Sequence, residues 1–305
     1  MITYGLGTIT YKSKDEQHQH LPGTPSARVN IPIGLSKDEF EEIETAILSI
    51  GIFTRYADLF NTVQWNFEDL IATVQSYLKA FIKKDVEIFR VREITLNINK
   101  DLLNVLSAFR FYLDYMDRSL KNDFSNSLEL VAKFNDYCSQ EYNNNFSYRF
   151  IYHLRNYAQH KGFIVSSVEL GENFGKENQF QINYHLNVNV GKQEIVRDKN
   201  LKKELKIEIE NLPEKINMIE HVNRCLASLA KIHKKITYDL LYTTLDAATL
   251  IQSHIKKLSY NKSDKVVVAI FVTEHPDENL KQVKGIRHTP INVAEIENIM
   301  SMIQK

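Results

Sequence analysis

The chain has 305 residues, enough to bury a substantial core as one large domain or two of ordinary size. Hydrophobic residues make up 43% and charged residues 25%, which is ordinary for a globular protein and excludes a disordered or collagen-like chain. The 38 basic residues balance the 38 acidic ones, so no net field draws the whole molecule to nucleic acid, and any RNA contact must be local.

Cysteine usage and hydropathy favour a reducing location away from membranes. Cys138 and Cys225 have no metal-ligand spacing and lie in stretches of helical periodicity, which argues against a zinc cluster or a disulfide framework. Residues 1–11 lack the features of a signal peptide, and nowhere do about 18 apolar residues follow one another. We therefore expect a cytoplasmic protein with no membrane partner, metal or other cofactor.

Residues 1–35 contain several glycines and prolines between short stretches of Ile, Thr and Tyr. This composition predicts an irregular N-terminal arm with one or two strands. Gly5 and Gly7 lack the third glycine and the preceding buried strand of a dinucleotide-binding loop, so we assign no nucleotide site there. His18 and His20 also lie in the arm, and we expect no metal site from them.

Helical periodicity begins at residue 36 and persists to residue 161. Ser36 and Glu39 form a capping box ahead of apolar residues spaced three and four apart, which predicts a helix start. The expected helices cover residues 36–60, 66–82, 86–121, 126–143 and 146–161, with a candidate break at 97–100. Residues 36–162 are thus expected to form one helical bundle.

The pattern changes after Gly162. Apolar and polar residues alternate from residue 181 to 190, which predicts a half-exposed strand. Residues 163–170 are its expected hairpin partner, with the turn within 171–178.

Helical spacing returns over residues 201–258, with breaks expected at Pro213 and near Thr237. Residues 265–273 then predict a strand that joins the hairpin, and residues 293–303 predict a last helix. Residues 163–305 therefore form the third expected part of the chain. The fold class expected is mainly α, a helical bundle with an attached small antiparallel sheet, and α+β overall.

The helix expected over residues 146–161 has two distinct faces. An apolar stripe recurs at helical spacing and should pack inward: Phe146, Phe150, Leu154 and Tyr157. A polar stripe lies about a quarter-turn away at ~100° per residue: Arg149, His153, Asn156 and His160. Such a polar stripe should meet water, a partner chain or a substrate.

Arginine, asparagine and histidine are the residue types that metal-free RNA cleavage requires. A base removes the proton of the ribose 2′-hydroxyl, which attacks the adjacent phosphorus, and an acid protonates the leaving 5′-oxygen. Histidine suits either proton transfer because its pKa lies near neutrality. Arginine can stabilise the charge that builds on the phosphate oxygens, and asparagine can orient the reacting groups.

The sequence Arg155-Asn156-x-x-x-His160 resembles the motif of HEPN proteins, an arginine followed by a polar residue and, four to six positions on, a histidine near a helix end. Residues 150–163 and the upstream segment 108–114 look like paired segments of bacterial HEPN-like proteins of unassigned role. The resemblance covers residues 36–165 and implies an all-α bundle. Members of this family include RNA-cleaving toxins, anticodon nucleases and phage-defence effectors, which dimerise with their motif helices facing each other.

The resemblance implies a homodimeric, metal-independent endoribonuclease acting on RNA. In that reading His160 is the acid or base, Arg155 stabilises the phosphate and Asn156 positions it. Further candidates for RNA or cleft contacts are Arg149, His153, Arg110 and Asp114. A toxin or phage-defence role would add an antitoxin or defence-system partner. The alternative is a HEPN-like module that dimerises or regulates by binding, without cleavage.

Two structural questions stay open at this point. Arg155 and His160 are about 140° apart around an ideal helix, so either the helix end unwinds or two subunits share the site. Arg155 could equally serve as a surface salt-bridge residue and His160 as a partner of the helix dipole.

Purely structural roles are also open for the other charged groups. Arg110, Asp114 and Asp117 share a helix face and favour a structural ion pair. The basic runs at residues 197–206 and 231–235 are more simply interpreted as solvated helix faces than as phosphate contacts.

Overall fold

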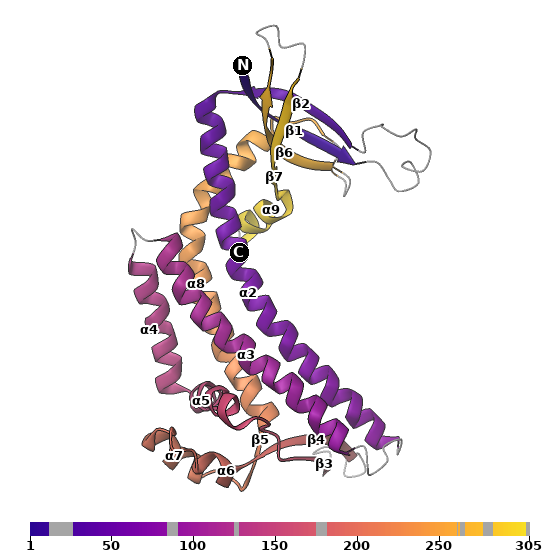
Figure 1. Ribbon diagram of the computed structural model, residues 1–305, viewed down its shortest axis with the longest axis vertical. Helices are drawn as coiled ribbons and strands as arrows, with labels where there is room; N and C mark the ends of the chain where they lie inside the picture. The colour runs from indigo at the N-terminus through magenta and orange to yellow at the C-terminus, as the bar shows by residue number, and fades with distance from the viewer. Residues whose placement is uncertain are drawn as a thin grey trace. The chain divides into compact units, whose positions relative to one another are not determined.

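The structure is a computed structural model that describes residues 1–11, 27–83, 91–124, 128–174, 182–260, 262, 266–276 and 283–302 (Figure 1). The fold is mainly α with two small antiparallel sheets, and α+β as a whole, as the sequence predicts. The chain divides into two compact units, Met1–Arg55 with Tyr238–Lys305, and Tyr56–Thr237. Helices α2 (Lys37–Ile82) and α8 (Met218–Ile255) each contribute residues to both units.

The first unit is built on a four-stranded antiparallel sheet with the order β2-β1-β6-β7. Its strands are β1 (Ile2–Tyr11), β2 (Ala27–Leu35), β6 (Val266–Glu274) and β7 (Gly285–Ile291), and helix α9 (Val293–Met302) follows. Ile9, Ala269 and Phe271 form a buried cluster on β1 and β6. The two inner strands, β1 and β6, are the most buried strands of this sheet.

Gly7 lies at the one irregularity in the pairing of β1 with β2. The register shifts between Leu6 and Thr8, and a Cβ atom added at Gly7 would lie 2.0 Å from the carbonyl oxygen of Asn30. Only glycine allows this approach of the two backbones. The Gly5-x-Gly7 pair thus belongs to a strand.

The second unit contains the helical bundle. Helix α3 (Val91–Asp123) runs antiparallel to α2 (Figure 1), since Tyr56 bonds to Asp123 near one end of the pair and Tyr77 to Asn97 near the other. Helices α4 (Leu128–Asn144) and α5 (Phe146–Lys161) pack against α3 and against each other.

Helix α8 packs in the same bundle through a half-buried histidine. The ring of His233 stacks on Phe60 of α2 with centroids 4.3 Å apart, and its Nδ1 lies 3.1 Å from the hydroxyl of Tyr112 in α3. Burial lowers the pKa of His233 to about 4, so the ring is neutral near pH 7. The interpretation of residues 231–235 as a solvated helix face is therefore wrong for His233, which packs between α2 and α3.

A three-stranded antiparallel sheet with the order β3-β4-β5 completes the second unit. The strands β3 (Ser167–Phe174) and β4 (Ile182–Gly191) form the predicted hairpin, but β3 begins four residues later than the predicted strand 163–170. Residues 171–174 of the predicted turn therefore pair with β4, and the rest of that turn lies outside the described residues. The short helices α6 (Lys192–Val196) and α7 (Lys203–Glu210) follow, and β5 (Lys215–Asn217) returns to pair with β4.

The expectation of a single sheet was wrong. The strand predicted at 265–273 is β6, which pairs with β1 and β7 and not with the hairpin. The one or two strands predicted within residues 1–35 are present as residues 2–11 and 27–35, but they pair within that sheet and do not form an irregular arm. The three expected parts of the chain do not match the two compact units. The pairing of β1 with β6 joins segments more than 250 residues apart, and local periodicity carries no information about such a pairing.

The predicted break at Pro213 is confirmed, because α7 ends at Glu210 and α8 begins only at Met218, but the other predicted breaks within helices were wrong. Helix α2 continues through residues 61–65, where Thr62 bonds back to the carbonyl of Asp58 and Asn66 to that of Thr62. Helix α3 is continuous across 97–100, and α8 across Thr237, since buried apolar residues flank both places. Tertiary burial outweighs the weak helix propensity of these polar stretches.

Both cysteines are free thiols in helices, Cys138 in α4 and Cys225 in α8. None of the helices within the described ranges combines the length and the apolar character needed to cross a membrane. The histidines at positions 18 and 20 lie outside the described residues.

A buried amide on α3 holds the chain that leaves α5. The side-chain oxygen of Asn99 accepts hydrogen bonds from the backbone N–H groups of Ile164 at 2.8 Å and Val165 at 2.9 Å. Its nitrogen donates to the carbonyl of Thr95 at 3.0 Å. Asn99 is 1% exposed, so no bulk water can replace these bonds.

We predict that Asn99→Ala lowers the free energy of unfolding by about 2–4 kcal/mol, because it leaves two buried N–H donors without an acceptor at ~1–3 kcal/mol each. Urea denaturation measures the loss, and amide exchange at Ile164 and Val165 locates it. The matched control is Asn97→Ala on the same helix, which removes one bond to the Tyr77 hydroxyl at a half-buried position. Equal losses of unfolding free energy in the two variants would contradict the role of Asn99 as the acceptor for Ile164 and Val165.

Candidate functional site

Helix α5 carries the motif residues and is regular to its end. Its N-cap, Asn145, accepts a hydrogen bond from the N–H of Tyr148 at 3.3 Å and donates to Ser228 of α8 at 2.7 Å. At the other end Gly162 has a φ of 88°, and its N–H bonds to the carbonyl of Ala158. A positive φ favours glycine and ends the helix. The helix therefore does not unwind before His160.

The apolar stripe of α5 packs inward as predicted. Phe150, Leu154 and Tyr157 are buried, and Phe146 stacks on Phe150 with centroids 5.5 Å apart. His221 of α8 meets both phenylalanine rings edge-on and lies 2.9 Å from the hydroxyl of Ser147. These contacts fix the rotation of α5 about its own axis.

The polar stripe of α5 divides into a covered half and an exposed half. Arg149 forms an ion pair with Glu208 of α7 at 2.5 Å and donates to the carbonyls of Tyr142 and Asn143. Asn156 and His160 are exposed. The chain's own α7 thus supplies a partner for part of the stripe, whereas the end nearest Gly162 stays open.

His153 belongs to the covered half. Its Nε2 lies 3.2 Å from the carboxylate of Asp198, and both side chains are about 10% exposed or less. Burial lowers the pKa of His153, although the nearby Asp198 carboxylate acts in the opposite direction. The ring is therefore neutral near pH 7 and donates its Nε2–H to Asp198, which makes it a structural tether.

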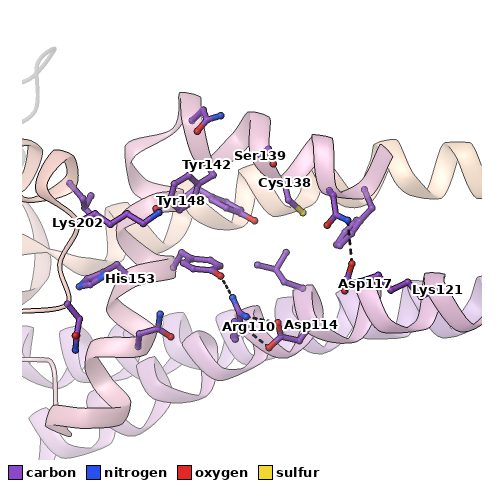
Figure 2. A pocket seen from close by; sticks show the side chains of 18 residues that line it. Arg110, Asp114, Asp117, Lys121, Cys138, Ser139, Tyr142, Tyr148, His153 and Lys202 are labelled. Carbon is purple, nitrogen blue, oxygen red and sulfur yellow. Dashed lines mark hydrogen bonds and ion pairs between the residues drawn. The ribbon is translucent and has the colours of Figure 1, made fainter. Parts of the chain in front are cut away.

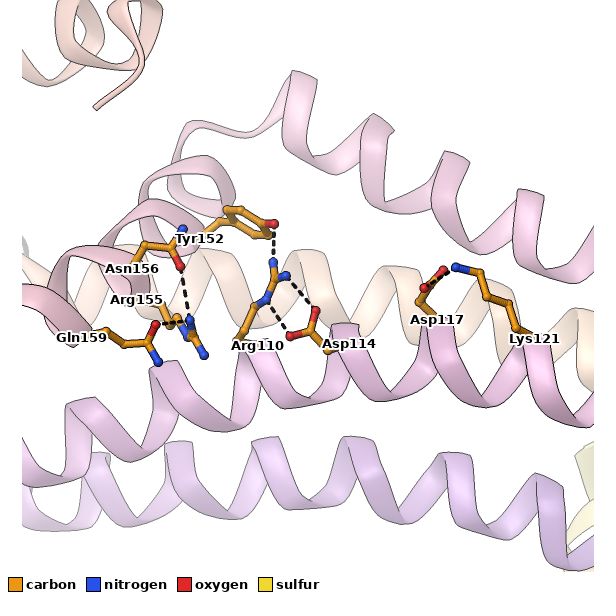
Figure 3. Close-up of polar contacts among 8 residues, drawn as sticks. All are labelled: Arg110, Asp114, Asp117, Lys121, Tyr152, Arg155, Asn156 and Gln159. Carbon is orange, nitrogen blue, oxygen red and sulfur yellow. Dashed lines mark hydrogen bonds and ion pairs between the residues drawn. The ribbon is translucent and has the colours of Figure 1, made fainter. Parts of the chain in front are cut away.

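Arg155 is half-buried and contacts two amide side chains of its own helix. It donates to the side-chain oxygens of Gln159 and, at 3.3 Å, of Asn156 (Figure 3). Both partners are neutral, so these contacts leave the positive charge of the guanidinium uncompensated. A phosphate oxygen could compete with them because a charge-assisted bond is stronger than a neutral one.

A cavity of about 800 Å³, hereafter the large cavity, opens between α3, α4, α5 and residues 200–205 (Figure 2). Two of the motif-helix candidates, His153 and Asn156, line it, as do Arg110 and Asp114. The other polar lining groups include Asp117, Lys121, Tyr142, Tyr152 and Lys202.

The charges on the α3 wall of the large cavity are paired with each other. Arg110 forms a two-bond ion pair with Asp114 at 2.8 and 2.9 Å and also donates to the hydroxyl of Tyr152 (Figure 3). Asp117 pairs with Lys121 at 2.6 Å. The expected structural ion pair is therefore correct for Arg110 and Asp114, while Asp117 has a different partner.

A second cavity of about 380 Å³, hereafter the His160 cavity, lies at the end of α5. His160, Lys161, Arg197 and Lys199 line it, together with Asp198, whose carboxylate is already bonded to His153. Its surroundings are therefore electropositive, which suits a phosphate group. This is a local basic patch on a chain of zero net charge.

The two cavities adjoin each other. Asn200 lines both, and the His153–Asp198 pair has one member in each lining. The turn at 197–202 therefore forms the partition between them. Within this turn the Asp198 carboxylate also accepts the N–H of Asn200 at 3.1 Å, and the N–H of Leu201 bonds to the carbonyl of Asp198.

The structure brings only some of the predicted site residues together. His160 lines its own cavity, Asn156 and His153 line the large one, and Arg155 lines neither. Sequence reasoning missed Tyr152 and Lys202, which also face the large cavity. Tyr152 lies four residues before Asn156 on α5 and could have been found from that spacing, whereas the position of Lys202 follows from the turn alone.

The His160 cavity can position and protonate an anion. It offers an imidazole, a group that can act as acid or base, and three basic side chains, which stabilise negative charge. Within the described part of the chain, no three side chains of His, Cys, Asp or Glu lie close enough to hold a metal ion.

Comparisons of this chain with protein-family models, curated proteins and solved structures found no match. The resemblance of residues 36–165 to HEPN proteins therefore remains a prediction.

We predict that Asp198→Ala speeds amide exchange throughout residues 197–202 by about tenfold or more, because the turn loses its contacts with His153 and with the N–H of Asn200. Exchange in α3 should not change. Asp136→Ala is the control, since this carboxylate accepts only an exposed bond from Gln140 at 2.7 Å. Unchanged exchange at 197–202 would show that the tether does not hold the turn.

Proposed function

We propose that this protein is a metal-independent endoribonuclease of HEPN type. The observation that carries the proposal is the exposed His160 at the end of a regular helix, in a cavity lined by three cations. A histidine beside a group of basic side chains that can hold a phosphate is what 2′-hydroxyl attack requires.

In the proposed reaction His160 acts on one of the two proton transfers. The ribose 2′-oxygen loses its proton and bonds to the adjacent phosphorus, and the bond from phosphorus to the 5′-oxygen breaks as that oxygen gains a proton. The products are a 2′,3′-cyclic phosphate and a 5′-hydroxyl. Lys161, Arg197 and Lys199 would stabilise the charge on the non-bridging oxygens.

We further propose that the active site is shared by two subunits. Helix α5 is regular through Lys161, and Arg155 contacts Gln159 and Asn156 while His160 lines a separate cavity. A second copy whose α5 faces the first would bring Arg155 of one subunit to His160 of the other. A two-fold axis would then create two such sites.

The biological setting belongs to the same proposal and rests on the resemblance alone. A toxin or phage-defence role, an antitoxin or defence-system partner and a cytoplasmic location would follow for a ribonuclease of this type. The competing proposal is a non-catalytic HEPN-like module. It is favoured by the Arg149–Glu208 ion pair and by the hydrogen bond from His153 to Asp198, which hold both residues in structural contacts.

RNA cleavage should persist in excess EDTA and leave 2′,3′-cyclic phosphate ends, because the attacking hydroxyl belongs to the substrate. His160→Ala should lower the rate by about 10²–10⁴-fold and leave the fold intact, since the side chain is exposed. End-mapping of the products and single-turnover rates measure both effects.

The control for this prediction is His153→Ala, which should mainly lower stability. Products with 5′-phosphates, or activity that only added magnesium restores, would refute the mechanism. RNA binding without cleavage by the wild type would favour the non-catalytic module.

Subunit mixing tests the shared site. Arg155→Ala and His160→Ala proteins should each be inactive, and each mixed dimer should contain one intact site and one site that lacks both groups. If half of the dimers are mixed, activity should return to about a quarter of wild type under two-fold symmetry. Native mass spectrometry verifies the mixed dimers.

Light scattering supplies the control for the mixing experiment, because the wild-type protein must be a dimer. A monomer at tens of micromolar protein would count against the shared site. If heterodimers are verified and activity does not return, Arg155 of one subunit does not act together with His160 of the other.

A further inference from the structure

The large cavity has the dimensions of a site for a small molecule. Its volume of about 800 Å³ falls within the ~300–1,000 Å³ usual for ligand pockets. It lies wholly within the second unit, and the reaction proposed for His160 makes no use of most of its lining. Its chemistry therefore needs an explanation of its own.

The walls of the large cavity combine aromatic rings with amide groups. Tyr142 and Tyr152 meet edge to face with their centroids 5.8 Å apart. Asn135 and Asn143 on α4 and Asn200 in the turn add hydrogen-bond donors and acceptors from two separate segments. A planar ring with polar edges, such as a nucleobase, matches this combination better than an aliphatic ligand does.

The distribution of charge gives the ligand an orientation. The Arg110–Asp114 and Lys121–Asp117 pairs are internally neutralised and lie along α3. Lys202 lies on the side of His153, away from Asp117 and Lys121 (Figure 2), and its ammonium contacts the neutral ring of Tyr142 at 5.0 Å. An anion would therefore sit at the Lys202 end, and an uncharged ring would fill the rest.

The Lys202 end also faces the proposed cleavage site. The turn at 197–202 carries two further cations, Arg197 and Lys199, besides Lys202. Arg197 and Lys199 line the adjoining His160 cavity, whereas Lys202 lines the large cavity. A phosphate near Lys202 would thus continue into the basic surroundings of His160. Because Asn200 lines both cavities, a nucleotide with its base in the large cavity could place its backbone in the His160 cavity.

We propose that the large cavity binds a nucleoside phosphate and recognises one base of the RNA next to the bond that is cut. The choice of ligand rests on the RNA substrate of the proposed function. The cavity then determines which nucleotide flanks the cleaved bond, and Lys202 binds its phosphate.

Calorimetry with the full chain tests the proposal, with AMP, CMP, GMP, UMP and inorganic phosphate titrated separately. One or two of the nucleotides should bind at least tenfold more tightly than the others and than phosphate. Ser139→Trp, which adds a large ring at the exposed rim, should weaken that binding at least tenfold. Lys202→Ala should lower the affinity for the nucleotide about tenfold, because it removes one charge-assisted bond to the phosphate. The affinity for the corresponding nucleoside should not change.

Lys206→Ala, an exposed lysine one turn further along α7, is the matched control and should have no effect. Circular dichroism establishes whether each variant is folded. If Ser139→Trp does not fold, the result with Lys202→Ala alone decides the outcome. Three results would overturn the proposal. They are the failure of every nucleotide to saturate the protein at ~10 mM, equal affinity for all four nucleotides, and an affinity that neither variant changes.

The proposed ribonuclease and the base pocket can fail separately. Selective nucleotide binding that the two variants weaken, in a protein that leaves RNA uncut, would support the pocket and refute the nuclease. Cleavage of RNA at positions that Ser139→Trp and Lys202→Ala leave unchanged would support the nuclease and overturn the pocket.

Discussion

The candidate site depends first on the buried amide of Asn99. By accepting two backbone hydrogen bonds from Ile164 and Val165, it fixes the chain against α3 directly after the motif helix ends. That anchor determines where β3 begins, and β3 in turn aligns β4. The segment that follows β4 carries Asp198, Lys202 and Glu208, so one polar side chain on a distant helix determines which groups return to cover α5.

One ion pair and one hydrogen bond to a carboxylate then decide which half of the polar stripe on α5 is available for chemistry. Glu208 pairs with Arg149, and Asp198 accepts a hydrogen bond from His153. Arg149 and His153 therefore hold the 197–210 segment in place. Burial of charged groups is costly unless they are paired, and the pairing here binds the segment to the helix. Asn156 and His160, beyond the covered region, stay exposed, and the turn at 197–202 separates the space around them into two cavities.

The balance of charge is local throughout this region. The wall of the large cavity on α3 is neutralised by its own ion pairs, whereas cations from the turn and from the end of α5 gather around His160. A chain without net charge can therefore still present one basic site to a phosphate. The arrangement joins a neutral, aromatic cavity to a cationic one, and this pairing of surfaces is the physical basis of both proposals.

The sequence by itself determined the helices and their faces. The capping box of Ser36 and Glu39, the inward stripe of Phe150 and Leu154 and the end of α5 at Gly162 are all present, because each rests on contacts within a few residues. Only the tertiary structure decided the pairing of β1 with β6, the continuity of α2, and the covering of His153 by Asp198. These depend on residues that are 45 to 272 positions apart in the chain, or on burial by distant elements, and neither leaves a mark on local periodicity.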